Sequence, residues 1–147
     1  MRTFELETSQ RLHRPLEGVF HFFADPRNLE RLTPPWLKFE ILTKGNVVMR
    51  AGLVIDYRIR LHGVPLRWQS EITVWDPPHR FVDEQRKGPY RLWIHEHTFE
   101  EVGGVTTVKD HVTYAVLGGA LVRALFVAPD LERIFQFRKE TLQALLG

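Results

Sequence analysis

Apolar and polar residues alternate along most of the chain, with the period expected of strands that bury one face. The first such run, residues 3–12 (TFELETSQRL), places Phe4, Leu6 and Leu12 on one side. The alternation continues across residues 36–116, where it is interrupted by the turn-forming stretches KGN, HGVP, DPP, KGP and VGGV. Because turns of this kind join antiparallel strands, the pattern predicts one strand near the N-terminus and six more after it.

Helical periodicity appears near both ends of the chain. Two short helices are predicted after the first strand: Pro15 opens PLEGVFHFFA, and Asp25 caps DPRNLERL, with Pro26 in its first turn. The longest element is C-terminal, and Pro129 marks a bend or break near its first third. Its apolar stripe consists of Leu121, Leu125, Ala128, Leu131, Phe135, Leu142 and Leu145. This order of elements predicts an α+β domain whose antiparallel sheet packs one face on a helix.

The VGGV stretch, residues 102–105, predicts how the strands on either side of it pair. If its glycines form a two-residue hairpin turn, His97 faces Asp110 and Trp93 faces Tyr114, all on one side of the sheet. The other side is expected to be solvated, and it carries Glu96, Thr98, Glu100, Lys109, His111 and Thr113.

The HGVP turn, treated in the same way, pairs Ile59 with Trp68 and Tyr57 with Ser70. The strand at residues 81–86 has two nearly equivalent faces, because the RKGP loop does not fix its register. We take its odd-numbered residues as inward: Phe81, Asp83 and Gln85. The even-numbered face, with Val82 and Glu84, is the alternative.

Length and composition narrow the class of protein. The 147 residues suit one domain, residues 1–147, and the absence of cysteine excludes disulfides, zinc fingers and thiol catalysis. The formal net charge is only +2, and the outer arginines are interleaved with acidic residues, so we expect no nucleic-acid partner. No run has the length of a membrane span, and no signal-peptide core is visible, which favours a soluble, cytoplasmic protein.

The stretch LWIHEHTFEE, residues 92–101, raises the question of a metal site. His95, His97 and Glu101 alternate onto one face, and the spacing imitates the first cupin motif. A second cupin motif is missing, and the only later histidine, His111, falls on the outer face. We therefore expect no metal and no cofactor, and we interpret the two histidines as polar groups in the wall of an apolar pocket.

Several long runs resemble one family. FADPRNLERLTPPWLKFEI, HGVPLRWQSEITVWDPPHRFVDEQRKGPYRLWIHEHTFEE, VKDHVTYAVLGG and IFQFR look like bacterial members of the SRPBCC superfamily, which includes START domains, the birch-pollen allergen and polyketide cyclase/dehydrases. The resemblance covers the whole chain. It implies a helix-grip fold, in which a curved seven-stranded sheet wraps round the long C-terminal helix and leaves a cavity for an apolar molecule. It implies no reaction, because the superfamily shares no catalytic motif.

The inward face of the predicted sheet is unusually polar for a solid core, since a buried polar group without a partner costs about 1 to 3 kcal/mol. A ligand-filled cavity removes that difficulty, and mutually satisfied hydrogen bonds in a packed interior are the alternative. The residues predicted to bind a ligand are Tyr57, Trp68, Ser70, Gln85, Trp93, His95, His97, Phe99, Asp110, Tyr114 and Leu125.

Two functions follow from this face. The favoured one is binding of a small hydrophobic molecule (a lipid, quinone or polyketide-like compound) between the sheet and the C-terminal helix. The alternative is an enzyme of the cyclase/dehydrase type, in which His97 held by Asp110 transfers a proton. A binding protein requires only the polar wall, and no separate catalytic signature is present.

The segment from Ala115 to Leu131 is almost wholly apolar, and Arg123 and Asp130 are its only charges. One sheet covers only one side of a helix, so part of this segment must meet something apolar outside the domain. We interpret it as a gate for ligand exchange, with transient membrane contact, and a homodimer contact is the alternative.

Overall fold

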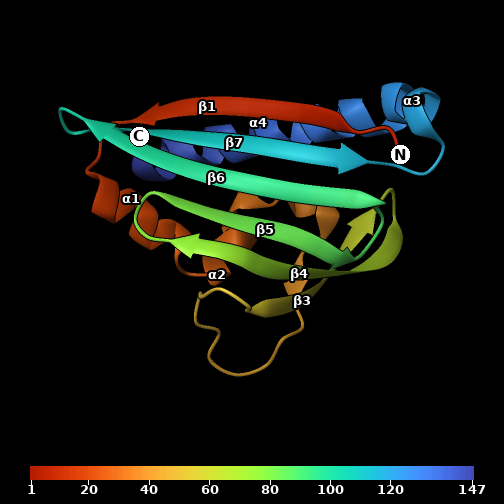
Figure 1. The fold of residues 1–147 in the computed structure, drawn as a ribbon, viewed down its shortest axis with the longest axis horizontal. Coiled ribbons are helices and arrows are strands. Elements are labelled where there is room, and N and C mark those ends of the chain that lie inside the picture. Colours follow the sequence, from red (N-terminus) through yellow and green to blue (C-terminus); the bar gives the residue numbers. More distant parts are fainter.

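The structure is a computed structural model that describes residues 1–147. Its seven strands form one antiparallel sheet in the order β1-β7-β6-β5-β4-β3-β2 (Figure 1). The strands are β1 (Phe4–Leu12), β2 (Glu40–Ile41), β3 (Val54–Leu61), β4 (Val64–Asp76), β5 (Arg80–Lys87), β6 (Leu92–Val102) and β7 (Val105–Ala115). The predicted number of strands, one followed by six, is confirmed.

In Figure 1 the long helix α4 runs behind β1 and β7, α1 lies at the left end of the sheet and α3 at its right end. The helices are α1 (Leu16–Phe23), α2 (Arg27–Leu32), the 3-10 turn η1 (Pro35–Leu37), α3 (Gly119–Val122), the π-helical turn η2 (Arg123–Val127) and α4 (Ala128–Leu146). This arrangement is the predicted α+β helix-grip fold. None of these helices is both long enough and apolar enough to cross a membrane.

Two apolar clusters hold the helices against the sheet. The first joins α1 and the far end of α4 to the sheet, and fully buried Leu12, Val19 and Leu142 belong to it. The second joins the start of α4 to the middle of the sheet through Leu131 and Phe135. Because the two clusters lie at different positions along α4, the space between them is where the interior is not filled by apolar packing alone.

Of the two predicted hairpins, one has the predicted register and the other does not. The VGGV turn pairs Val102 with Val105 and His97 with Asp110, as predicted. The pairing predicted across the HGVP turn is wrong by two residues. In the structure Tyr57 faces Trp68, Ile55 faces Ser70 and Ile59 faces Leu66. The turn is centred on His62 and Gly63, which have φ of 50° and 80°. A two-residue turn of this kind needs positive φ at both central positions, and β-branched Val64 disfavours that conformation.

Strand β5 settles the choice between its two faces. Phe81 pairs with His97 and Asp83 pairs with His95, so the odd-numbered residues share the inner face, as chosen. The alternative with Val82 and Glu84 inward is excluded by this register.

The start of the C-terminal helical segment departs from the predicted stripe. Leu121 and Leu125 are 70% and 60% exposed, although both were placed on the buried face. Leu125 lies within the π-helical turn η2 and Leu121 lies before it, and the wider turn shifts both residues relative to the stripe of α4. Pro129 stands in the first turn of α4, directly after the π-helical turn, so the helix changes type near this proline while the backbone stays helical across it. 

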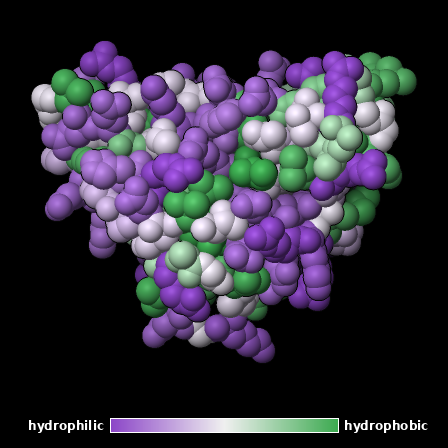
Figure 2. Space-filling model, viewed as in Figure 1, coloured by the Kyte–Doolittle hydropathy of each residue, from purple (hydrophilic) through white to green (hydrophobic).

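The outer face of the molecule in Figure 2 is largely hydrophilic, and hydrophobic residues gather at the end where α3 lies. The exposed apolar side chains of this end are Leu117, Leu121, Leu125 and Phe126.

Candidate functional site

A cavity of about 200 Å³ lies between the inner face of the sheet and helices α2 and α4. Of its 28 lining residues 18 are hydrophobic, so the wall is mainly apolar. Six of the eleven residues predicted to bind a ligand line it: Tyr57, Trp68, Ser70, Trp93, His95 and His97. The structure thus places a cavity where the strand faces indicated one.

Five of the predicted ligand-binding residues do not line the cavity, for different reasons. Gln85 is turned toward the KGP loop, where its side chain accepts from the N–H of Tyr90 and donates to its carbonyl oxygen at 3.0 and 2.7 Å. Phe99 packs into the first apolar cluster, with its ring 5.2 Å from that of Phe20. Leu125 is at the surface because of the π-helical turn.

The other two lie one layer behind the wall. Tyr114 is buried in the second cluster, and its hydroxyl accepts from Nε of Arg123 at 3.3 Å. Asp110 sits behind His95, to which it is hydrogen-bonded, and therefore supports the wall without forming it.

Aromatic rings form one side of the cavity. Tyr57 and Trp68 are stacked, with centroids 5.9 Å apart and planes 14° apart, and Trp93 meets Trp68 edge-on at 5.5 Å. The hydroxyl of Ser70 accepts from Nε1 of Trp68 at 3.0 Å and lies 3.3 Å from the Tyr57 hydroxyl. Burial raises the pKa of Tyr57 above its ordinary value, so its hydroxyl stays protonated and can donate.

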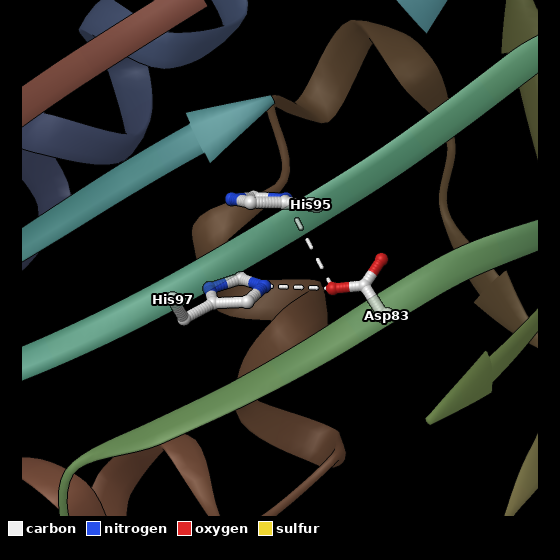
Figure 3. A group of neighbouring side chains, drawn as sticks. All are labelled: Asp83, His95 and His97. Atoms are coloured by element: carbon white, nitrogen blue, oxygen red, sulfur yellow. Dashed lines mark hydrogen bonds and ion pairs between the residues drawn. The ribbon is translucent and has the colours of Figure 1, made fainter. Parts of the chain in front are cut away.

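A cluster of charged and titratable side chains forms another part of the wall. Nε2 of His97 lies 2.7 Å from Oδ2 of Asp83, and Nε2 of His95 lies 2.7 Å from Oδ1 of Asp110. Figure 3 shows Asp83 reaching from β5 toward both imidazoles of β6. Asp110 also lies 3.3 Å from Nδ1 of His97, within the reach predicted for that pair. The short bond of His97 goes to Asp83, however, so the expected two-residue pair is part of a larger network.

Arg138 completes this network and was missed by the sequence argument. Its Nη2 lies 3.3 Å from Oδ1 of Asp110 and 3.4 Å from Nδ1 of His97, and the residue is only 7% exposed. The sequence did contain a sign of this role. Arg138 falls on the same helical stripe as Leu131, Phe135 and Leu142, where it is a lone charge among apolar residues. A buried arginine in that position needs a buried carboxylate as partner.

Each carboxylate of the cluster has neighbouring groups that stabilise its charge. Burial alone would raise the pKa of Asp110, but the guanidinium of Arg138 and the bonds from both histidines hold that pKa well below its ordinary value. Burial likewise opposes ionisation of Asp83, yet the hydrogen bond from His97 and the charges nearby lower its pKa. Both carboxyl groups are therefore ionised in the folded protein.

The surroundings shift the pKa values of the two histidines in opposite directions. Burial lowers the pKa of His95, and repulsion from His97 adds to this effect despite the bond to Asp110. Burial also disfavours the charged form of His97, but its hydrogen bonds to Asp110 and Asp83 outweigh that and raise its pKa. The cluster thus separates two neighbouring imidazoles of the same strand by their environments.

The ligand set considered from the sequence is not assembled. Glu101 accepts a hydrogen bond from the backbone N–H of Leu16 at 2.6 Å, at the far end of β6. His111 lies on the outer face, with Nε2 3.0 Å from Glu5. The carboxylate that joins the two histidines is Asp83, whose ligand atom and theirs all lie within 4.8 Å of one another.

The family follows from these features together with a comparison of the whole sequence. Residues 12–136 match the model of a family described as polyketide cyclase / dehydrase and lipid transport. The chain belongs to this family. The match includes Asp83, His95, His97 and Asp110 of the polar cluster and the start of α4, and it ends two residues before Arg138. The SRPBCC resemblance stated from the sequence is confirmed. No curated protein matches the chain by sequence.

Solved structures from distant organisms share the fold. The Zhui aromatase/cyclase from Streptomyces sp. R1128 aligns with a TM-score of 0.75 at 16% identity, over 97% of this chain and 93% of that one. Major latex-like protein 151 from Panax ginseng aligns with a TM-score of 0.73 at 12% identity, over 99% and 98% of the two chains. Protein CV1439 from Chromobacterium violaceum reaches 0.75 at 16% identity, with 97% of each chain covered. At such identities these likenesses show the common architecture.

Proposed function

We propose that this protein binds a small hydrophobic molecule in the cavity between the sheet and α4. The observation that carries the proposal is the division of the cavity wall into an aromatic side and a hydrogen-bonding side. The aromatic side removes apolar surface from water, at about 25 cal/mol per Å² buried. Polar groups of the wall, the Ser70 hydroxyl and Nδ1 of His95 among them, orient the oxygen atoms of the ligand.

Size and shape narrow the class of ligand. An apolar cavity of about 150 Å³ holds a benzene ring, and the cavity here measures about 200 Å³. Aromatic side chains line the cavity, among them those of Tyr57, Trp68 and Trp93, and aromatic rings pack well against a planar ring in edge-to-face or offset contacts. Among lipid, quinone and polyketide-like ligands, the cavity therefore favours a compact, planar, oxygenated ring compound over an extended acyl chain.

Fluorescence titration tests this proposal, because Trp68 and Trp93 line the cavity. We expect 1,4-naphthoquinone, added in the presence of a metal chelator, to quench the tryptophan emission saturably and palmitate to compete weakly. Ile134→Trp fills the cavity from α4 and should weaken binding at least tenfold. Leu125→Trp adds the same side chain at an exposed position of the same helical segment and should leave the affinity unchanged. Equal affinities of the two variants would contradict binding in the cavity.

A further inference from the structure

The nitrogen atoms of the two histidines are divided between two carboxylates. Oδ1 of Asp110 lies 2.7 Å from Nε2 of His95 and 3.3 Å from Nδ1 of His97. The other nitrogen of each ring faces Oδ2 of Asp83, at 4.0 Å for Nδ1 of His95 and 2.7 Å for Nε2 of His97. When Asp110 accepts an N–H from each ring, three lone-pair donor atoms converge on one point beside the cavity.

From this convergence we propose that Asp83, His95 and His97 bind a divalent first-row transition metal ion. Two imidazoles and one carboxylate suit zinc, cobalt, iron and manganese. Adjacent ligand atoms about 2.1 Å from an ion with tetrahedral geometry are about 3.4 Å apart. The distances of 2.7 and 4.0 Å bracket this value, so small rotations of Asp83 and His95 would centre the ion.

Asp110 acts in this site as the residue that orients the ligands. A histidine that binds a metal commonly donates its second ring N–H to a carboxylate, which fixes the tautomer and the ring orientation. Asp110 is hydrogen-bonded to Nε2 of His95 at 2.7 Å and lies 3.3 Å from Nδ1 of His97, which Nη2 of Arg138 also approaches at 3.4 Å. Thr8 and Arg138 hold the carboxylate of Asp110 at 3.2 and 3.3 Å. The second layer of a metal site is thus already built into β1, β7 and α4.

The charges of the site also suit a divalent ion. With both imidazoles neutral, the two carboxylates and Arg138 leave one net negative charge in a buried cluster. A divalent ion reverses that to one net positive charge, which an anionic oxygen of a ligand in the cavity would neutralise. All three ligands line the cavity, and Asp83 keeps 20% of its side chain exposed, so the open coordination positions face the apolar space.

Three protein ligands with open positions are the arrangement of metal sites that activate a bound molecule, whereas structural sites are closed by a fourth ligand. This inference goes beyond the proposed binding function and does not depend on it. Its test needs only the ion, so the two can fail separately.

Cobalt is the probe, because its visible absorption reports the coordinating atoms. Protein freed of metal by a chelator and then dialysed is titrated with Co²⁺ and afterwards with Zn²⁺. We expect one equivalent of Co²⁺ to give visible bands and to raise the melting temperature, and we expect Zn²⁺ to displace it. Asp83→Asn should weaken Co²⁺ binding at least 100-fold, and Asp110→Asn about 10 to 100-fold. His111→Gln, which removes a histidine beside two glutamates on the outer face, is the control and should change nothing.

Paramagnetic NMR of the unmodified protein keeps the test decisive even if a variant fails to fold. The ring protons of His95 and His97 should shift strongly on addition of Co²⁺, and those of His111 should not. Absence of stoichiometric binding, or binding that survives Asp83→Asn in a folded variant, would overturn the proposal. So would shifts confined to surface histidines.

Discussion

Replacing Arg138 by methionine tests whether its guanidinium stabilises the buried carboxylate of Asp110. Nη2 of Arg138 lies 3.3 Å from Oδ1 of Asp110, and the two side chains are 9% and 6% exposed. Methionine fills a similar volume but leaves the carboxylate without its cation. Breaking a buried pair in this way costs about 3 to 5 kcal/mol. For a chain of this size, each kcal/mol lowers the melting temperature by roughly 2 to 4 °C, so we expect a fall of roughly 6 to 20 °C.

Urea and thermal unfolding measure this effect, and α4 offers a matched control. Arg133 lies 2.9 Å from Asp130, but its side chain is 64% exposed, so Arg133→Met should cost less than about 1 kcal/mol. Adding Asp110→Asn to Arg138→Met should restore part of the stability, because the unpaired buried charge is then removed. If Arg138→Met costs no more than Arg133→Met, the electrostatic account of the cluster is refuted.

Two further predictions concern the helical entry and the turns. In hydrogen exchange, residues 118–127, which contain the π-helical turn, should open faster than residues 134–145. Addition of 1,4-naphthoquinone should increase the protection of residues 118–127. Uniform protection that the ligand does not change would refute a gate and favour a dimer contact. Gly63→Ala should destabilise the protein by about 1 to 2 kcal/mol because φ is 80°, whereas Gly18→Ala in α1, where an added methyl group meets nothing within 4 Å, should stabilise it by about 0.5 to 1 kcal/mol in urea unfolding. Equal effects of the two glycine variants would contradict the turn geometry.

The strand pattern was predictable because each strand buries one face and its residues alternate. The same argument gave the pairing of His97 with Asp110, since a Gly-Gly turn admits positive φ at both positions. The HGVP pairing was misplaced by two residues, because histidine rarely adopts the positive φ that His62 has in this turn. The predicted and the observed pairing put the same residues on the inner face, so the residues predicted for the cavity wall did not change.

The interior of the site was less predictable. Leu125 was misplaced because a π-helical turn leaves no mark in the apolar spacing. Asp83 was placed inward, but its bond to His97 depends on how β5 and β6 lie across their shared ladder, which no local pattern records. Arg138 lies on α4, 28 residues after Asp110 in the sequence, and only the tertiary packing of α4 on the sheet brings the two residues together.

Native mass spectrometry of protein purified from its own host tests the central claim most directly. The account predicts that the protein carries a small organic molecule, released by gentle activation and identified after extraction as a ring compound with oxygen substituents. The unmodified protein and Leu125→Trp should retain it, and Ile134→Trp should lose it. The account would be contradicted if all three proteins showed only the mass of the polypeptide without a bound molecule. It would also be contradicted if Ile134→Trp retained the molecule as well as the unmodified protein does.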